Sequence, residues 1–303
     1  LTIDFAGGDP LQDEDSVTII QNAVDTLGKD KVSVTTTGRG IYNLSRMNML
    51  HSIKHCEITL DASHAYLQSD ETPLMETSNI SREENDYSSN NVETIDIIPT
   101  LVQSLTINIP VINDDLSDEE IENLIKKIEL IRERTKNIEL DTSIIRLMPT
   151  GKMSGDSNKE IYKAYQPIAV VKKIKKKLEE KNIKCHLHCS LRILPAFDEK
   201  GKCHCNMLEN KIGIDCAGNV YACAWGGYAN NDESPTQNPY YLGNLTRTTL
   251  KKILDGESRT RQYSKIYNEI NNNNFRKACS IVSYYFEGDI LKESDPLSLE
   301  IGE

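Results

Sequence analysis

The spacing of apolar residues divides the first half of the chain into short runs and longer amphipathic segments. In the short runs, apolar and β-branched residues alternate with polar ones, which is the two-residue period of a half-buried β-strand. These runs lie at residues 1–8, 31–38, 56–63, 105–113 and 138–151. Each is short enough for one strand of a globular domain, so the pattern predicts strands at these five places.

The amphipathic segments between and after these runs predict helices. Residues 15–27 place their apolar side chains on one helical face, and a glycine follows them as a C-terminal cap. In residues 117–135, Ser117 and Glu120 form the pattern of a capping box, and isoleucine and leucine repeat at helical spacing. A Lys-rich stretch at 158–181 predicts one further long helix.

Strands that alternate with helices predict an α/β fold with a parallel sheet. Ligands of such sheets bind at the carboxyl ends of the strands. Paired glycines there allow a close approach of the backbone, and a neighbouring acid suits the ammonium group of a zwitterionic ligand. The turn motifs of this half all follow predicted strands: Gly7-Gly8-Asp9-Pro10, Thr37-Gly38, Asp61-Ala62-Ser63 and Pro149-Thr150-Gly151.

The 303-residue chain is acidic, with a formal net charge of −11, 38% apolar residues and 27% charged residues. Proteins that bind nucleic acids need a basic face, so this balance argues against a nucleic-acid partner. The basic run Lys172–Lys177 is interpreted as a solvated helix face. No apolar run reaches the roughly 18 residues of a membrane-spanning helix, so we expect no membrane partner and a cytoplasmic protein.

The eight cysteines are unevenly distributed, because seven of them follow residue 184. Such a cluster indicates either disulfides or a metal site. A long chain without secretory features favours metal ligation in a reducing cytoplasm. Between Cys205 and Cys223 the sequence predicts a β-hairpin with its turn at Ala217–Asn219. A hairpin returns the chain, so it would bring the two thiols near one point.

The strand-end motifs resemble those of the radical S-adenosylmethionine (SAM) enzymes. Gly7-Gly8-Asp9-Pro10 is similar to the Gly-Gly-Glu-Pro that ends the second strand of that family, with Asp in place of Glu. The segments "VSVTTTGRGI" and "EITLDAS" resemble the third and fourth strands, and "RLMPTGK" resembles the sixth. The resemblance covers residues 1–155. It implies a partial (β/α)6 TIM-like barrel over residues 1–180.

The same resemblance implies where the cofactors bind, although it identifies no catalytic side chain. The residues implied to bind SAM are Gly7, Gly8, Asp9, Pro10, Thr37, Gly38, Asp61, Ser63 and Pro149. In the family, a Cys-x3-Cys-x2-Cys loop after the first strand holds the catalytic [4Fe-4S] cluster. Because the chain opens at what resembles the second strand, we expect this loop upstream of Leu1.

The C-terminal part resembles the SPASM or twitch extension, which follows many radical SAM barrels and binds auxiliary iron–sulfur clusters. The resemblance rests on Cys205-x12-Gly218-x4-Cys223 and on "YLGNLTRTTLKKIL" at 241–254. It implies a small, cysteine-rich α+β domain over residues 181–303 with one auxiliary [4Fe-4S] cluster. The implied ligands are Cys203, Cys205, Cys216, Cys223 and Cys279, and Cys189 is another candidate for the fourth position.

Zinc is an alternative to the auxiliary cluster. Four thiolates in a tetrahedral array suit zinc as well as iron. His186, His188 and His204 lie close to the cysteines in the sequence, and histidine is a common zinc ligand. The resemblance favours iron and sulfide, while the ligand chemistry leaves both metals open.

The resemblance implies an oxidoreductase that reductively cleaves SAM to a 5′-deoxyadenosyl radical, which then abstracts a hydrogen from the substrate. We expect a peptide or protein substrate, modified by crosslinking, epimerisation or oxidation, and an electron donor such as flavodoxin or ferredoxin. Two alternatives stay open. One is a radical SAM enzyme that acts on a small molecule, such as a nucleotide or sugar. The other is a catalytically inactive metal-binding module with the same fold.

Overall fold

The structure of the protein is a computed structural model. It describes residues 2–7, 9–36, 38, 40–41, 44, 49, 57–61, 102, 104–112, 114–136, 138–150, 155–198, 203, 205, 207, 211–229, 234–256, 278–290 and 295–298. The chain divides into two compact units, which are described separately. Unit 1 comprises Leu1–Arg146 and Pro167–Leu187, and unit 2 comprises Leu147–Gln166 and His188–Glu303. The family-based domains at 1–180 and 181–303 stay a prediction.

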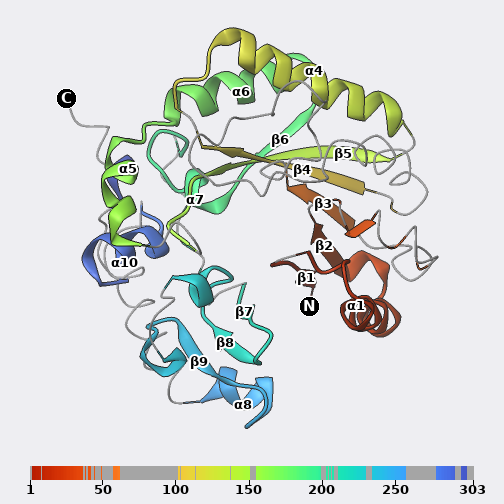
Figure 1. Ribbon diagram of the computed structural model, residues 1–303, viewed down its shortest axis with the longest axis vertical. Coiled ribbons are helices and arrows are strands. Elements are labelled where there is room, and N and C mark those ends of the chain that lie inside the picture. The colour runs from red at the N-terminus through yellow and green to blue at the C-terminus, as the bar shows by residue number, and fades with distance from the viewer. Residues whose placement is uncertain are drawn as a thin grey trace. The chain divides into compact units, whose positions relative to one another are not determined.

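Unit 1 is built on a six-stranded sheet (Figure 1). Its strands are β1 (Ile3–Phe5), β2 (Val32–Thr36), β3 (Glu57–Asp61), β4 (Ser104–Val111), β5 (Glu139–Arg146) and β6 (Lys184–Leu187). They lie in the order of the sequence, and every neighbouring pair is parallel. The register aligns one row of apolar residues across five strands: Phe5, Val34, Ile58, Leu105 and Leu140.

This topology confirms a mixed α/β fold with a parallel sheet. Sequential strand order means that every crossover moves the chain in the same direction along the sheet, as in a (β/α) barrel. In the described part of the chain, β1 pairs with β2 alone and β6 with β5 alone. The partial (β/α)6 barrel therefore stays a prediction. The strand β6 was not predicted, because its four residues, Lys184–Leu187, carry only a short alternation.

The helices of unit 1 begin and end where their capping residues indicate. The helix α1 spans Glu14–Leu27, and Gly28 ends it with a φ of 92° and an N–H bond to Val24. The helix α4 spans Asp118–Arg134 and begins with the predicted capping box. Its apolar stripe is buried, as the sequence predicted: Ile121, Leu124, Ile125, Ile128 and Ile131. A short 3-10 helix, η1 (Lys29–Lys31), joins α1 to β2.

The predicted long helix over residues 158–181 is wrong. The structure has two helices there, α5 (Lys159–Ala164) in unit 2 and α6 (Ile168–Glu180) in unit 1. Pro167 lies between them as the N-cap of α6. Proline has no backbone N–H and disfavours helical geometry in the preceding residue, so a helix usually ends before it.

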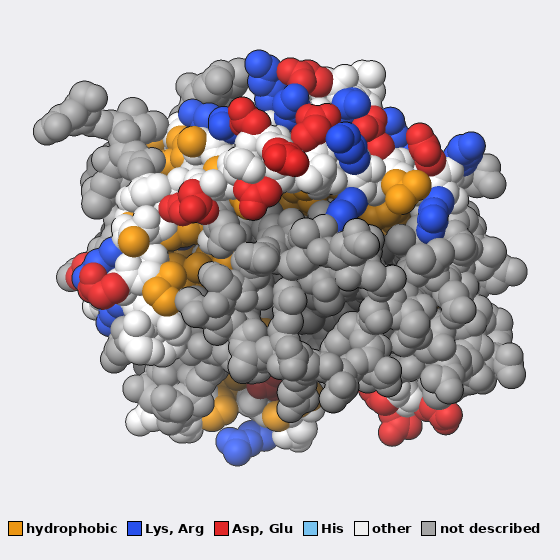
Figure 2. All heavy atoms as spheres, turned by 45° about the horizontal axis from the view of Figure 1, so that its top comes forward, with side chains coloured by type: hydrophobic (Ala, Val, Ile, Leu, Met, Phe, Trp, Pro, Cys, Tyr) orange, Lys and Arg blue, Asp and Glu red, His pale blue; other side chains and the backbone are white. Residues whose placement is uncertain are grey.

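The outer face of α4 and α6 carries charges of both signs (Figure 2). Lys173 pairs with Asp118 at 2.9 Å, and Lys177 pairs with Glu122 at 3.2 Å. These lysines belong to the basic run that was interpreted as a solvated helix face. Their pairing with acids of α4 supports that interpretation, and such exposed pairs each contribute little to stability.

Unit 2 contains a second, smaller sheet of three antiparallel strands in the order β7-β8-β9. Its strands are β7 (Gly213–Ile214), β8 (Asn219–Tyr221) and β9 (Tyr241–Asn244). Its other helices are α7 (Cys189–Arg192), α8 (Leu250–Asp255) and α10 (Ser280–Glu287). Its 3-10 helices are η6 (Asp156–Asn158), η7 (Gly226–Tyr228), η8 (Pro235–Gln237) and η9 (Pro296–Ser298).

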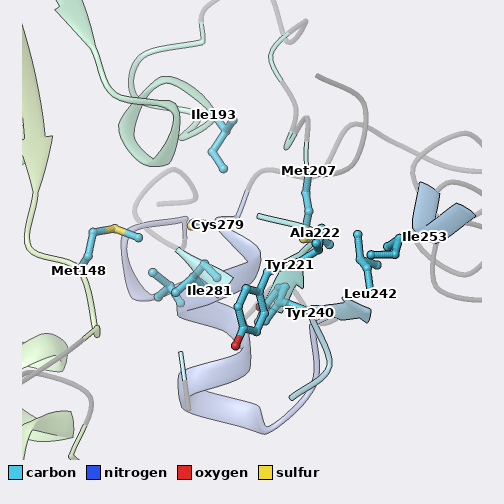
Figure 3. Packing of buried hydrophobic residues seen from close by; sticks show 12 residues of the cluster. Met148, Ile193, Met207, Tyr221, Ala222, Tyr240, Leu242, Ile253, Cys279 and Ile281 are labelled. Atoms are coloured by element: carbon cyan, nitrogen blue, oxygen red, sulfur yellow. The ribbon is translucent and has the colours of Figure 1, made fainter. Parts of the chain in front are cut away.

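One buried hydrophobic cluster joins these elements of unit 2 (Figure 3). It gathers side chains that are distant in the sequence: Met148, Ile193, Met207, Val220, Tyr221, Ala222, Tyr240, Leu242, Ile253, Cys279, Ile281 and Val282. We call this set the unit 2 core. Its burial supplies the main driving force for bringing the cysteine-bearing segments together.

None of the helices in the described part of the chain has the length and apolar character needed to cross a bilayer. The loose stretch predicted at 68–93 lies outside the described residues.

Candidate metal centre and strand-end site

The hairpin of β7 and β8 is held by one carboxylate at its turn. Oδ1 of Asp215 accepts hydrogen bonds from the backbone N–H groups of Ala217 and Asn219, each at 2.9 Å. Its Oδ2 accepts bonds from the Asn219 amide at 2.9 Å and from the Tyr221 hydroxyl at 3.0 Å. Gly218 has a φ of 77°, which favours glycine in this turn. The hairpin predicted from the sequence is confirmed.

The protonation equilibria of this turn follow from those bonds. Burial raises the pKa of Asp215, but the hydrogen bonds from Asn219 and Tyr221 outweigh it and leave that pKa below its usual value. Burial and the charge of Asp215 together raise the pKa of Tyr221 to about 12. Asp215 is therefore a carboxylate at neutral pH, and it orders the turn as an anion.

The close approach of the hairpin to Cys223 depends on a missing side chain. A Cβ at Gly213 would lie 2.9 Å from the carbonyl oxygen of Cys223 and 2.9 Å from Cα of Ala224. Any other residue at this position would push β7 away from the segment that carries the thiol. The sequence "KIG" at the start of the hairpin is thus part of what positions Cys223.

None of the seven cysteines that the structure describes forms a disulfide. Cys203, Cys205 and Cys223 are partly buried and pack against the unit 2 core, to which Cys279 itself belongs. Cys279 is only 7% exposed and is the N-cap residue of α10. The structure therefore gathers four of the five predicted metal ligands on one core.

The fifth predicted ligand, Cys216, lies elsewhere on the hairpin. It was expected within a strand, but it lies in the turn between β7 and β8 and is exposed. The turn begins earlier than predicted because Asp215 bonds to the N–H groups that follow it. Of the other cysteines, Cys185 lies on β6 in unit 1. Cys56 falls outside the described residues.

The thiols of unit 2 act on one another electrostatically. Burial raises the pKa of Cys223 to about 12, and negative charge at Cys205 and then Cys189 adds to the effect. Burial likewise raises the pKa of Cys189, with a further contribution from Cys205. A cation or a cationic cluster would relieve both effects, since it stabilises thiolates that burial disfavours.

Four of the predicted ligands thus share one neighbourhood on the unit 2 core. In the described part of the chain, no three His, Cys, Asp or Glu side chains converge closely enough to hold one ion. The thiols are nevertheless near enough to feel each other's charge. A multi-iron cluster binds its cysteines at separate iron atoms, whereas a zinc ion needs all its ligands around one point.

The histidines considered as zinc ligands have different surroundings. His188 makes an edge contact with the Trp225 ring, with the ring centroids 5.9 Å apart. His186 lies on β6 in unit 1, where its Nε2 is 3.3 Å from a carboxylate oxygen of Asp141. His204 falls outside the described residues.

In unit 1, the predicted strand-end site is centred on Asp9, which follows β1. Its Oδ1 accepts hydrogen bonds from the Thr36 hydroxyl at 2.7 Å and the Leu11 N–H at 3.2 Å. Its Oδ2 accepts the N–H of Gly40 at 2.9 Å. These bonds orient the carboxylate at the carboxyl edge of the parallel sheet.

Two glycines near Asp9 adopt backbone conformations with positive φ. Gly7 has a φ of 92° and Gly38 a φ of 87°, conformations that favour glycine. The N–H of Gly38 donates to the Thr36 hydroxyl at 3.1 Å, so the loop after β2 is tied to the end of its own strand. Pro10 follows Asp9 and is half-buried.

Of the five remaining residues predicted to bind SAM, the structure describes two. Asp61 is the last residue of β3, at the same edge of the sheet as the end of β2. Pro149 is buried and belongs to unit 2. Gly8, Thr37 and Ser63 lie outside the described residues. One residue not predicted as part of the site also lies at this edge, the buried Arg146 that ends β5.

Comparison with known protein families gives a match in the C-terminal part of the chain. Residues 203–280 match the SPASM family, which is described as an iron–sulfur cluster-binding domain. Among curated proteins, none matches the chain. The match supports an iron–sulfur protein of the SPASM-containing, radical SAM type. The matched segment contains the hairpin and all five cysteines that the sequence predicted as metal ligands.

Proposed function

We propose that the protein is a radical SAM enzyme that carries one auxiliary [4Fe-4S] cluster in unit 2. The observation that carries the proposal is the SPASM match, which falls on the segment whose thiols gather at the unit 2 core. SPASM domains are typical of radical SAM enzymes, so this match also favours an oxidoreductase. Reductive cleavage of SAM and hydrogen abstraction from the substrate are part of the proposal.

SAM would bind at the carboxyl edge of the parallel sheet in unit 1. The carboxylate of Asp9, held by Thr36 and Gly40, would accept the ammonium group of the methionine moiety. The backbone at Gly7, in a left-handed conformation, leaves space for a ligand to approach closely. Sites at this edge are usual for parallel α/β sheets.

The auxiliary cluster would be held by thiols on the unit 2 core, among them Cys205, Cys223 and Cys279. When bound, it would supply one-electron transfer for the oxidation of the product radical. Aromatic side chains around these thiols would shield the cluster from solvent. Tyr240 and Trp225 pack at or against the unit 2 core and would limit the access of water.

The proposed substrate is a peptide or protein, modified by crosslinking, epimerisation or oxidation. An electron donor such as flavodoxin or ferredoxin would supply the reducing electron in the cytoplasm. The support is the association of SPASM domains with radical SAM chemistry, together with a surface of net negative charge that does not favour nucleic acid.

The test of the enzyme activity uses the full-length protein, purified anaerobically and reconstituted with iron and sulfide. After incubation with SAM and dithionite, we expect 5′-deoxyadenosine in a mass-spectrometric assay. Peptide substrates are recognised by a mass change that depends on SAM, and nucleotides or sugars serve as the competing substrate class. A cluster-loaded protein that never produces 5′-deoxyadenosine would contradict the proposal.

The test of SAM binding uses two variants of the same loop. Asp9→Asn removes the charge proposed to hold the ammonium group, so we expect weaker SAM binding by equilibrium dialysis. Asp13→Asn is the matched control, because Asp13 caps α1 by accepting the Ser16 N–H at 2.9 Å, and asparagine caps equally well. Equal binding by both variants would remove Asp9 from the site.

Metal analysis separates the enzyme from the inactive metal-binding module. Iron and sulfide near four of each per auxiliary cluster support the proposal. Zinc without sulfide would favour the structural alternative, since zinc performs no redox chemistry.

A further inference from the structure

We propose that Tyr162 and Tyr165 are positioning residues for SAM binding, because they hold the backbone of the turn around Pro149. This inference rests on the proposed function and on the prediction that Pro149 binds SAM. The turn begins at Leu147, which directly follows Arg146, the last residue of β5. The turn and both tyrosines belong to unit 2. Neither tyrosine lies in a motif that resembles the radical SAM family.

The turn itself is closed by a hydrogen bond between residues two apart. The N–H of Thr150 donates to the carbonyl of Met148 at 2.8 Å, across Pro149. Such a three-residue turn needs a central φ close to the value that the proline ring fixes. Met148 is 7% exposed and belongs to the unit 2 core, whereas Leu147 and Thr150 are half-buried. The turn is thus anchored at Met148 and leaves part of its surface open to a ligand.

Two tyrosine hydroxyls hold consecutive residues of this turn. The hydroxyl of Tyr162 donates to the carbonyl of Met148 at 2.6 Å. The hydroxyl of Tyr165 accepts the N–H of Leu147 at 3.1 Å. Both tyrosine side chains are buried. Because these bonds are shielded from water, they fix the direction of the backbone where it leaves β5.

The helix α5 sets the spacing of the two tyrosines. Tyr162 lies within it, and Tyr165 is its C-cap residue, whose N–H donates to the carbonyl of Ile161 at 3.1 Å. Residues three apart in a helix lie on one face, so both rings reach the same stretch of backbone. One short helix thus presents a donor and an acceptor to two neighbouring residues of the turn.

The C-terminal helix α10 supports this arrangement from the side. The Tyr162 ring meets the Tyr285 ring of α10 edge-on, with the ring centroids 5.3 Å apart. The Tyr285 hydroxyl donates to the carbonyl of Gly155 at 2.7 Å, and Nζ of Lys159 lies 5.5 Å from the centroid of the Tyr285 ring. Side chains of α5 and α10 together therefore hold Tyr162 in place.

Ligand affinity separates a positioning role from a purely structural one. A substitution that lowers the free energy of unfolding but leaves nearly all molecules folded does not change the dissociation constant of a ligand. A substitution that releases the turn raises that constant, because binding must then order the turn again. The affinity for SAM is therefore the decisive measurement.

The experiment compares tyrosine-to-phenylalanine variants of the full-length protein after anaerobic reconstitution with iron and sulfide. Tyr162→Phe removes the donor to Met148 but keeps the ring that contacts Tyr285. Tyr221→Phe is the matched control, because it removes another hydroxyl of unit 2, which donates to Asp215 of the hairpin at 3.0 Å. Tyr165→Phe is the second test variant.

Three quantities are measured on each variant. The probe is SAM, whose dissociation constant is obtained by equilibrium dialysis without denaturant. Urea unfolding gives the stability, and far-UV circular dichroism checks that the variant folds. Amide hydrogen exchange followed by mass spectrometry reports on the backbone N–H groups of Leu147 and Thr150.

We expect Tyr162→Phe to raise the dissociation constant of SAM about threefold to tenfold, which is the size of effect that one net hydrogen bond produces. Amide exchange at Thr150 becomes faster in this variant, because Tyr162 no longer holds the turn. Tyr165→Phe shows the same direction of change, since the N–H of Leu147 loses its acceptor. Tyr221→Phe loses stability and keeps the SAM dissociation constant of the unsubstituted protein.

The possible failures are distinguishable. If the unsubstituted, iron-loaded protein does not bind SAM, the proposed function fails and this inference fails with it. If the unsubstituted protein binds SAM, and Tyr162→Phe and Tyr165→Phe bind it as tightly as Tyr221→Phe does, the inference alone is wrong. If Tyr162→Phe does not fold, Tyr165→Phe decides by the same dissociation constant and the same amide exchange.

Discussion

The hydroxyl of Thr36, the last residue of β2, donates a hydrogen bond of 2.7 Å to the carboxylate of Asp9, which follows β1. The neighbouring loop adds a second bond to the same carboxylate through the N–H of Gly40 at 2.9 Å. Two adjacent parallel strands are thus joined at their carboxyl ends through one acid. The arrangement keeps a negative charge at the edge where the proposed SAM site lies.

Removing this hydroxyl is expected to destabilise unit 1. Thr36 is 1% exposed, so Thr36→Val leaves the Asp9 carboxylate with one partner fewer in a partly buried place. A hydrogen bond to a charged group contributes about 1.5–3 kcal/mol, and we expect a loss of that size in the free energy of unfolding. Urea denaturation measures it.

Thr35→Val is the control for that variant, because the Thr35 hydroxyl reaches Asp4 only at 3.4 Å on the exposed side of the sheet. We expect a change of less than about 0.5 kcal/mol there. Equal losses of unfolding free energy in the two variants would show that the hydrogen bond from Thr36 to Asp9 contributes no more to stability than the contact of Thr35 with Asp4.

Gly40 leaves no room for a side chain. An added Cβ would lie 2.5 Å from Cβ of Leu11 and 2.6 Å from Oδ1 of Asp9. Gly40→Ala is therefore expected to lower the free energy of unfolding by about 1–3 kcal/mol and to weaken SAM binding by displacing Asp9. Gly155→Ala is the control, since its nearest atom would be 3.5 Å away. If Gly40→Ala were as stable as the unsubstituted protein, the loop around residue 40 would have shifted to remove the close contacts with Leu11 and Asp9 at no cost in free energy.

The charge of Asp215 should make the stability of unit 2 depend on pH. Its pKa in the folded protein is below the usual 3.8, so its contribution is present above the unfolded-state pKa and is lost as the pH falls through the folded-state pKa. Asp215→Asn should therefore be less stable than the unsubstituted protein at pH 7, and this difference should shrink below about pH 4. Urea unfolding at both pH values measures it, and a gap that does not change with pH would contradict the assignment.

The thiols should react at different rates in the metal-free protein. The pKa of Cys223 is raised to about 12, so at pH 8 its thiolate is scarce, whereas Cys216 is exposed in the turn. With iodoacetamide at pH 8 we expect Cys216 to be alkylated early and Cys223 last, as measured by peptide mass spectrometry. Rapid alkylation of Cys223 in the folded protein would argue against its burial.

Removal of the metal should lower the thermal stability of unit 2. The proposed ligands are contributed by segments far apart in the sequence, from Cys205 to Cys279. A cluster bound to the folded state alone stabilises that state by mass action. We expect chelation under anaerobic conditions to lower the melting temperature, and Cys279→Ala to show a smaller decrease on chelation than Cys185→Ala. An unchanged melting temperature after loss of the iron would mean that the metal does not bridge these segments.

Local patterns in the sequence were sufficient for most of the individual elements. The helix α4 was predicted from Ser117, Glu120 and its isoleucine stripe, and the hairpin was predicted from the turn at Gly218. The interactions that form these features, such as capping hydrogen bonds and turn geometry, join residues only a few positions apart. A short segment of sequence is therefore enough to predict them. Where the local signal was short, as in β6, the prediction failed, because four residues of alternating pattern do not distinguish a strand from a loop.

The sequence by itself therefore determined the alternation of strands and helices, the acidic charge, and a hairpin flanked by cysteines. Only the tertiary structure decided which thiols share one environment, because the unit 2 core gathers residues from Met148 to Val282. It directed Cys216 to solvent and brought the turn of Cys189 beside Trp225. Spacing along a chain limits which residues can meet, but the burial of apolar surface selects the contacts that form.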